Sequence, residues 1–308
     1  MTLPGTISFD GRRVLLKYHR LLSGSGVHPP NSLPALRELL DGGAQVIEFD
    51  VTAITGGEYL LIHDDTLDRE TTGTGPARTL TPDAAKRLRL RGSEEAPALL
   101  SEVSGVLAAH RRPVKVQVDL KDQEPLSVDE ARVFLRAIDP LRSNPQLAVV
   151  VGCLGDWNLR LLRRLDATLA VGLDFALYLD APVPEFPRLP MRENVHGYLD
   201  DHPLGYRRGI PVRDYLLDRI ESLCRLIPGA VEVYLRLEFI AQARRDGVNP
   251  VEIVRSTLGD ILIDGWTLNA DNPQAETMLR LLLESGVGQV TTDTPVQLAA
   301  LLGQGTAR

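Results

Sequence analysis

Two carboxylates lie two residues apart within an apolar, β-branched run, QVIEFDV, at residues 45–51. Alternate residues of a strand face the same side, so Glu48 and Asp50 are expected to point together. Two like charges in an apolar setting repel, and their removal from water adds to the cost. A cation held by both side chains would remove this repulsion.

Further polar residues stand at the carboxyl ends of apolar runs that are typical of strands. The predicted strands over residues 13–18, 59–63 and 114–121 end in such residues, which are His19 and Arg20, His63, and Asp119 and Lys121. Another run, DILIDGWTLN, ends in Trp266 and Asn269, and VTTD ends in Asp293. If all these strands are parallel, most of these side chains converge on one end of the sheet.

The residue types at these strand ends suit phosphodiester chemistry. Three carboxylates (Glu48, Asp50 and Asp119) are hard oxygen ligands for Mg²⁺ or Ca²⁺. Two histidines can divide the roles of general base and general acid, and Arg20 and Lys121 can neutralise an anionic substrate. Each element also has a structural explanation, such as a plain ion pair between Asp119 and Lys121. Their placement at strand ends of one polarity favours a shared site.

Strand-like and helix-like segments alternate along the chain, which predicts an α/β fold. Strands are predicted over residues 13–18, 45–51, 59–63, 114–121, 147–152, 169–175, 230–237, 260–268 and 288–292. Helices are predicted over residues 33–40, 99–110, 127–138, 156–166, 213–226, 250–259, 272–284 and 295–302, and a further helix is predicted to begin at Thr81-Pro82-Asp83. Eight or nine strands separated by helices favour a single-domain (β/α)₈ TIM barrel over residues 1–308, with a short cap after His63. A proline-rich stretch near 180–212 predicts an excursion from the barrel.

Composition excludes several classes of protein. Lys+Arg 34 against Asp+Glu 41 gives a net charge of −7, which argues against general nucleic-acid binding. The chain has two cysteines, Cys153 and Cys224, and their wide separation predicts reduced, buried thiols. No signal-like segment and no apolar run of about 18 residues occurs, so we predict a cytoplasmic protein without stable membrane insertion.

Several spaced motifs resemble those of the glycerophosphodiester phosphodiesterases, which are (β/α)₈ barrels. In chain order they are HR (19–20), PPNS (29–32), GGAQVIEFDV (42–51), HDDTLDRETTGTG (63–75), DLK (119–121), WTLN (266–269) and TDTP (292–295). The resemblance spans residues 14 to 298, and its motifs occur in the family's order. It implies a small phosphodiester substrate, hydrolysed to glycerol 3-phosphate and an alcohol in a reaction that depends on a divalent metal.

The resemblance also implies a role for individual residues. The metal ligands would be Glu48, Asp50 and Asp119, the acid/base pair His19 and His63, and the substrate-binding residues Arg20, Lys121, Trp266 and Asn31. In the family, the 2-hydroxyl of the substrate's glycerol attacks phosphorus, and water then opens the cyclic phosphate. This course agrees with a set of acids, bases and cations at the strand ends.

Departures from the family pattern leave alternatives open. Leu21 replaces the family's glycine, Pro30 replaces its glutamate, and Asp119 is one methylene shorter than the usual ligand. The short Asp119 and the GGAQVIEFDV run are similar to the sphingomyelinase D/phospholipase D toxins, which implies a lyase alternative that leaves a cyclic phosphate from a lysophospholipid. A third alternative is a non-catalytic barrel that binds a phosphorylated ligand. The sequence leaves open Mg²⁺ or Ca²⁺, the alcohol released and a homo-oligomer formed through the 180–212 excursion.

Overall fold

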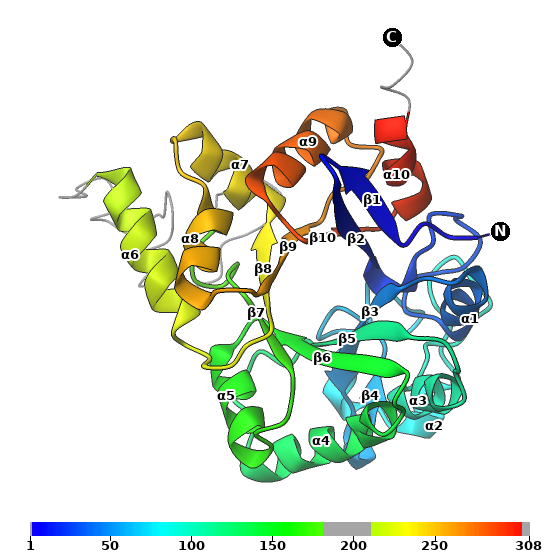
Figure 1. The fold of residues 1–308 in the computed structure, drawn as a ribbon. Coiled ribbons are helices and arrows are strands. Elements are labelled where there is room, and N and C mark those ends of the chain that lie inside the picture. Colours follow the sequence, from blue (N-terminus) through cyan, green and yellow to red (C-terminus); the bar gives the residue numbers. More distant parts are fainter. Residues whose placement is uncertain (1, 181–210, 304–308) are drawn as a thin grey trace.

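Eight parallel strands form a closed barrel in the computed structural model, which describes residues 2–180 and 211–303 (Figure 1). The parallel pairing of β2 with both β10 and β3 closes the ring. The barrel strands are β2 (Arg12–Tyr18), β3 (Val46–Ala53), β5 (Val114–Leu120), β6 (Leu147–Cys153), β7 (Val171–Asp174), β8 (Glu232–Arg236), β9 (Leu262–Trp266) and β10 (Gln289–Thr292). The predicted TIM barrel is confirmed.

Helices cover the outside of the barrel and return the chain from each strand to the next (Figure 1). They are α1 (Leu33–Gly42), α3 (Leu100–Ala108), α4 (Val128–Arg142), α5 (Asp156–Leu165), α6 (Val212–Cys224), α7 (Leu237–Arg245), α8 (Pro250–Leu258), α9 (Ala275–Ser285) and α10 (Pro295–Gly303). Capping chemistry sets several boundaries. Ser32 accepts the Ala35 N–H at the start of α1, and Gly43 ends that helix with φ 79°, a conformation that favours glycine.

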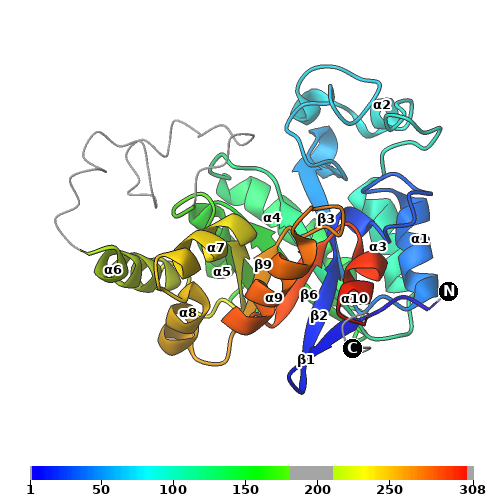
Figure 2. The same cartoon turned by 90° about the horizontal axis from the view of Figure 1, so that it is seen from above.

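The segment between β3 and α3, residues 55–99, forms a small cap at one end of the barrel (Figure 2). It contains β4 (Tyr59–Leu60), which pairs antiparallel with β3, and the one-turn helix α2 (Pro82–Ala85). The prediction that residues 59–63 form a barrel strand is therefore wrong. Leu60 and Ile62 are buried in a separate core that belongs largely to the cap, while Leu61 packs into the main core. An apolar run with two buried faces looks the same in sequence in either place.

The barrel interior contains ion pairs where aliphatic side chains are more usual. Lys17 on β2 pairs with Asp264 on β9, and both are fully or almost fully buried. Nearer the amino ends of the strands, Lys115 Nζ lies 2.6 Å from Glu232 Oε1 and 2.5 Å from Gln289 Oε1. Paired charged side chains thus occupy part of the barrel interior that apolar side chains usually fill.

Two further predictions concern the excursion near 180–212 and the expected lack of membrane insertion. The predicted excursion near 180–212 falls almost wholly on residues 181–210, which lie outside the described residues. Within the described ranges, no helix combines the length and apolar character needed to cross a membrane.

Candidate active site

Three carboxylates lie together at the carboxyl ends of neighbouring barrel strands. Glu48 and Asp50 lie on β3, and Asp119 on β5 is the register partner of Asp50. Glu48 and Asp50 are buried, whereas Asp119 is partly exposed. One oxygen from each carboxylate lies within 4.8 Å of an oxygen of the other two. The structure therefore brings together the three residues that the sequence grouped.

Two cations border this acidic cluster. Lys121 Nζ lies 2.9 Å from Asp50 Oδ1 and also pairs with Asp119 Oδ2, while Arg20 Nε lies 3.3 Å from Asp50 Oδ2. Burial and the adjacent negative charge of Asp50 raise the pKa of Glu48. Burial alone would raise the pKa of Asp50 too, but Lys121 and Arg20 hold it below its usual range.

The loop after β2 is built around the two β3 carboxylates. Arg20 adopts a positive φ of 50°, and its backbone N–H donates to Glu48 Oε2 at 2.7 Å. Asn31 Nδ2 donates to Asp50 Oδ2 at 2.9 Å, and Asn31 Oδ1 accepts the Asp50 N–H at 3.2 Å. The Asn31 amide therefore holds Asp50 at both its backbone and its side chain.

His19 follows β2 and is held by a carboxylate from the last barrel strand. Its Nδ1 lies 2.7 Å from Asp293 Oδ1, and Asn269 Nδ2 donates to Asp293 Oδ2 at 2.7 Å. Burial alone would raise the pKa of Asp293, but the hydrogen bond with His19 holds that pKa below its usual range. An ionised Asp293 fixes the ring so that Nε2 is the nitrogen left for chemistry.

His63 reaches the site from the cap, and not from a barrel strand as its sequence context predicted. Its Nδ1 lies 2.9 Å from Asp64 Oδ1, so this imidazole also keeps Nε2 available. Burial lowers the pKa of His63 to about 4, and the positive charge of Lys121 acts in the same direction. His63 and His19 both act to lower the pKa of Asp50, so the two rings lie near enough to this carboxylate to affect its charge.

Trp266 closes β9, and the guanidinium of Arg236 stands 5.7 Å from the centroid of its ring. Arg236 pairs in turn with Asp180 and with Glu238. The indole Nε1 of Trp266 has no hydrogen-bond partner within the described part of the chain. The other eight predicted site residues are linked to one another by contacts or by electrostatic interactions. Trp266 instead contacts Arg236.

Three acidic residues near the site had not been predicted as functional. Asp64 and Glu70 hold His63 within the cap. Asp174 ends β7, and burial raises its pKa to about 8, with the Ala176 N–H opposing and the negative charge of Asp119 adding to this shift. Its position two residues after Gly172, in a run that alternates like the other strands, is the sequence signal that could have identified it.

The donor set fits a divalent cation. Mg²⁺ and Ca²⁺ prefer carboxylate oxygens, and Glu48, Asp50 and Asp119 supply three carboxylates whose mutual repulsion a cation would relieve. Within the described residues, His63, Asp64 and Glu70 form a second group of comparable spacing. In that group the Asp64 carboxylate already binds Arg69 and His63, and the Glu70 carboxylate binds backbone N–H groups. Carboxylates of the first group also have protein partners, but this group lies on the barrel strands beside Arg20 and Lys121, which can bind an anionic substrate, so we take it as the candidate metal site.

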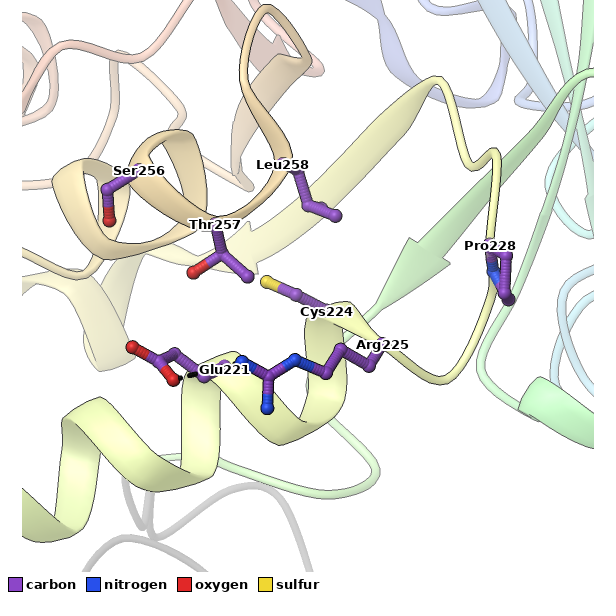
Figure 3. Close-up of a pocket in the computed structure, with 7 residues that line it drawn as sticks. All are labelled: Glu221, Cys224, Arg225, Pro228, Ser256, Thr257 and Leu258. Atoms are coloured by element: carbon purple, nitrogen blue, oxygen red, sulfur yellow. Dashed lines mark hydrogen bonds and ion pairs between the residues drawn. The ribbon is translucent and has the colours of Figure 1, made fainter.

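A pocket of about 460 Å³ lies elsewhere, between the ends of α6 and α8 (Figure 3). It is lined by Glu221, Cys224, Arg225, Pro228, Ser256, Thr257 and Leu258. These residues lead into β8 and β9, so the pocket lies near the amino ends of the strands, away from the carboxylates. Burial raises the pKa of the Cys224 thiol to about 12, which makes it a poor nucleophile. This pocket lacks the chemistry of the barrel mouth.

Comparisons with known proteins agree with the barrel fold. The model of the family described as "Glycerophosphoryl diester phosphodiesterase family" matches residues 19–164. A glycerophosphodiester phosphodiesterase of Caldanaerobacter subterraneus is 23% identical over 222 residues, which cover 66% of this chain and 86% of that protein. Glycerophosphodiester phosphodiesterase 1 of Mus musculus is 36% identical over 98 residues, but these cover only 29% of each chain.

Solved structures share the fold over nearly the whole chain. A phosphodiesterase of Oleispira antarctica, in complex with the product sn-glycerol-3-phosphate, has a TM-score of 0.63 at 17% identity and covers 94% of this chain and 96% of its own. A glycerophosphodiester phosphodiesterase of Agrobacterium tumefaciens has a TM-score of 0.58 at 18% identity, covering 94% and 98%. Residues 19–164, which match the family's model, are thus similar in sequence to the glycerophosphodiester phosphodiesterases, and nearly the whole chain shares the fold of their solved structures.

Proposed function

We propose that this chain hydrolyses glycerophosphodiesters to sn-glycerol 3-phosphate and an alcohol, with a divalent cation held by Glu48, Asp50 and Asp119. One observation carries the proposal: a single cluster of acidic oxygen donors lies near two histidines, each with Nδ1 bound to a carboxylate. The product bound in the Oleispira antarctica relative supports sn-glycerol 3-phosphate as the product here.

The residues around the cluster can bind the substrate. When bound, Mg²⁺ or Ca²⁺ supplies positive charge to the phosphate oxygens. Arg20 and Lys121 border the same carboxylates and can bind the remaining phosphate oxygens. Trp266, backed by Arg236, offers an apolar face to the glycerol carbons. Asn31 was predicted to bind substrate, but its amide is bonded to Asp50, so we assign it to the orientation of that ligand.

The environments of the two histidines separate their roles. The lowered pKa of His63 keeps its imidazole neutral near pH 7, so Nε2 can accept the proton of the attacking hydroxyl. The carboxylate of Asp293 binds His19 Nδ1, which leaves Nε2 of that ring to donate a proton to the departing alcohol oxygen. When water attacks in a second step, the same two nitrogens can exchange these roles.

Product analysis tests the proposal. Metal-stripped protein is incubated with glycerophosphocholine or with lysophosphatidylcholine, with Mg²⁺, with Ca²⁺ or with neither, and the products are followed by ³¹P NMR. We expect metal-dependent formation of glycerol 3-phosphate, which His19→Ala and Glu48→Ala abolish. A cyclic phosphate that persists would support the lyase alternative. An absence of turnover with every metal and both substrates would contradict the proposed hydrolase.

A further inference from the structure

The carboxylate of Glu70 accepts hydrogen bonds from two consecutive backbone amides of the cap. The His63 N–H points between its two oxygens, at 3.1 Å from Oε1 and 3.3 Å from Oε2. The Asp64 N–H donates to Oε1 at 2.8 Å. A carboxylate suits this position because its two oxygens can accept several donors at once, and hydrogen bonds to a charged acceptor are stronger than neutral ones.

The residue before Glu70 holds the side chain that orients the His63 ring. Arg69 donates to Asp64 through Nε at 2.6 Å and through Nη2 at 2.5 Å, in a two-point contact. Asp64 Oδ1 in turn lies 2.9 Å from His63 Nδ1. Arg69 therefore binds the Asp64 side chain that orients His63, and Glu70 binds the backbone amides of His63 and Asp64.

Glu70 is itself anchored in the cap. Its carbonyl oxygen accepts the Arg91 N–H at 2.9 Å, and the next residue, Thr71, is fully buried and donates its N–H to Leu67 O at 3.0 Å. On the barrel side, Thr52 Oγ1 donates to Ile62 O at 3.1 Å, directly before His63. The backbone at His63 is thus attached to β3 on one side and to Glu70 on the other.

We propose that Glu70 is a positioning residue for His63: its carboxylate fixes the backbone from which the imidazole projects. This inference rests on the proposed role of His63 in proton transfer. His63 differs from His19 in needing such support, because it lies on a cap loop, whereas His19 directly follows a barrel strand.

A double-mutant cycle tests whether Glu70 acts through His63. We measure kcat and KM for wild type, Glu70→Ala, His63→Ala and the double variant on glycerophosphocholine. In the wild-type background we expect Glu70→Ala to lower kcat by about 100-fold, since a displacement of about 1 Å can cost that much, with little change in KM. In the His63→Ala background the same substitution should lower kcat less than twofold. Glu94→Ala, an exposed cap carboxylate, is the matched control and should leave kcat unchanged.

The outcomes separate the inference from the proposed function. If Glu70→Ala lowers kcat by the same factor with and without His63, Glu70 does not act through His63 and the inference is wrong, while the proposed function stands. If His63→Ala alone leaves kcat unchanged, the proposed role of His63 fails and the inference fails with it. If Glu70→Ala does not fold, Glu70→Gln replaces it in the same cycle, because its amide keeps one acceptor oxygen.

A second readout requires no turnover. In protein labelled with ¹³C-histidine, the His63 ring signal, assigned by its loss in His63→Ala, reports the order of the imidazole. Glu70→Ala should shift and broaden the His63 signal and leave the His19 signal in place. Titration with Mg²⁺ or Ca²⁺ followed by calorimetry should give the wild-type affinity, because Glu70 does not contact the three acidic ligands. A change confined to metal affinity would overturn the inference.

Discussion

His19 Nδ1 lies 2.7 Å from Asp293 Oδ1, although the two residues stand at opposite ends of the chain. The closure of the barrel makes this contact, because β10 pairs with β2 and Thr292 is the register partner of Tyr18. Each of these strands is followed at once by a functional side chain. The first and last strands thus assemble a histidine–carboxylate pair that no local segment contains.

Asp293→Asn should lower kcat by about 100-fold or more, because general acid–base catalysis contributes roughly 10²–10⁴-fold and His19 Nδ1 loses the ionised carboxylate that orients the ring. Asp293 lies outside the proposed ligand set, so calorimetry with Mg²⁺ or Ca²⁺ should return the wild-type affinity. Asp271→Asn, at an exposed site after β9, is the control. Equal loss of kcat and metal affinity in Asp293→Asn would contradict the assignment of Asp293 to His19.

Glu48→Gln should separate folding from metal binding. Without metal, its free energy of unfolding should equal or exceed that of wild type, because the neutral amide removes repulsion from Asp50 and can still accept the Arg20 N–H. In wild type, metal at about 100 times its Kd should stabilise the fold by about 2.7 kcal/mol. Glu48→Gln should lose most of this increment in thermal unfolding with and without metal. A full metal-induced rise in Tm would remove Glu48 from the ligand set.

The pKa of His63 predicts how stability depends on pH. The folded state lowers the pKa of His63 to about 4, whereas the unfolded chain has the ordinary value of about 6.5. As the pH falls from about 6.5 to about 4, the unfolded state is protonated first, so His63 lowers the free energy of unfolding over this range. Well above pH 6.5, His63 is neutral in both states and does not make stability depend on pH. Chemical denaturation of wild type and His63→Gln across this range checks the sign. The variant should show a shallower loss, and identical slopes would refute the lowered pKa.

The buried pair of Lys17 and Asp264 should contribute strongly to stability when one partner is removed. Lys17→Met leaves Asp264 without its cation and should lower the free energy of unfolding by about 3–5 kcal/mol. Adding Asp264→Asn should recover part of this loss, since the amide oxygen can still accept the bonds of Gln289 and Thr291. Urea unfolding of the single and double variants measures both effects. A double variant less stable than Lys17→Met would show that the charge of Asp264 has other support.

The barrel and the proximity of its three carboxylates were predictable, because strands of period two present Glu48 and Asp50 on one face, and parallel strands end at one mouth. The position of His63 on the cap was not predictable, because apolar residues such as Leu60 and Ile62 suit a barrel strand and the cap core equally well. Helix α7 was missed for a similar local reason. It begins at Leu237, directly after Arg236 ends β8, with no glycine, proline or capping side chain to mark the change.

The supports of the site were harder to predict than its reacting groups. Asp293 and Asn269 were visible at strand ends, but their contact with each other and with His19 depends on the closure of the barrel. Asp174 lacks a motif, and its raised pKa comes from burial against Asp119, a residue distant in sequence. Positions that act through a neighbour have no chemical signature of their own until the chain is folded.

Gly152 on β6 makes room for Asp119, the third proposed metal ligand. A Cβ at this position would stand 2.6 Å from Gln117 Nε2 and 2.7 Å from Asp119 Oδ1, both closer than such atoms approach. Gly152→Ala should therefore displace Asp119, a side chain that can move more easily than the β6 backbone. Lys17 donates to Gln117 Oε1, which turns Gln117 Nε2 toward Asp119 and limits the movement of Gln117. We expect metal affinity to fall by about 10-fold, within the range seen when supports of metal ligands are lost.

Gly105→Ala is the matched control, because a Cβ there meets nothing within 4 Å and the residue lies inside helix α3. It should raise the free energy of unfolding by about 0.5–1 kcal/mol and leave metal affinity unchanged. Calorimetric titration with Mg²⁺ and with Ca²⁺ measures both variants. If Gly152→Ala binds metal as wild type does while kcat is retained, Asp119 is not a ligand of the cation. If affinity falls and Gly152→Ala still unfolds near the wild-type Tm, the loss is local to Asp119, as the close approach of its carboxylate to β6 requires.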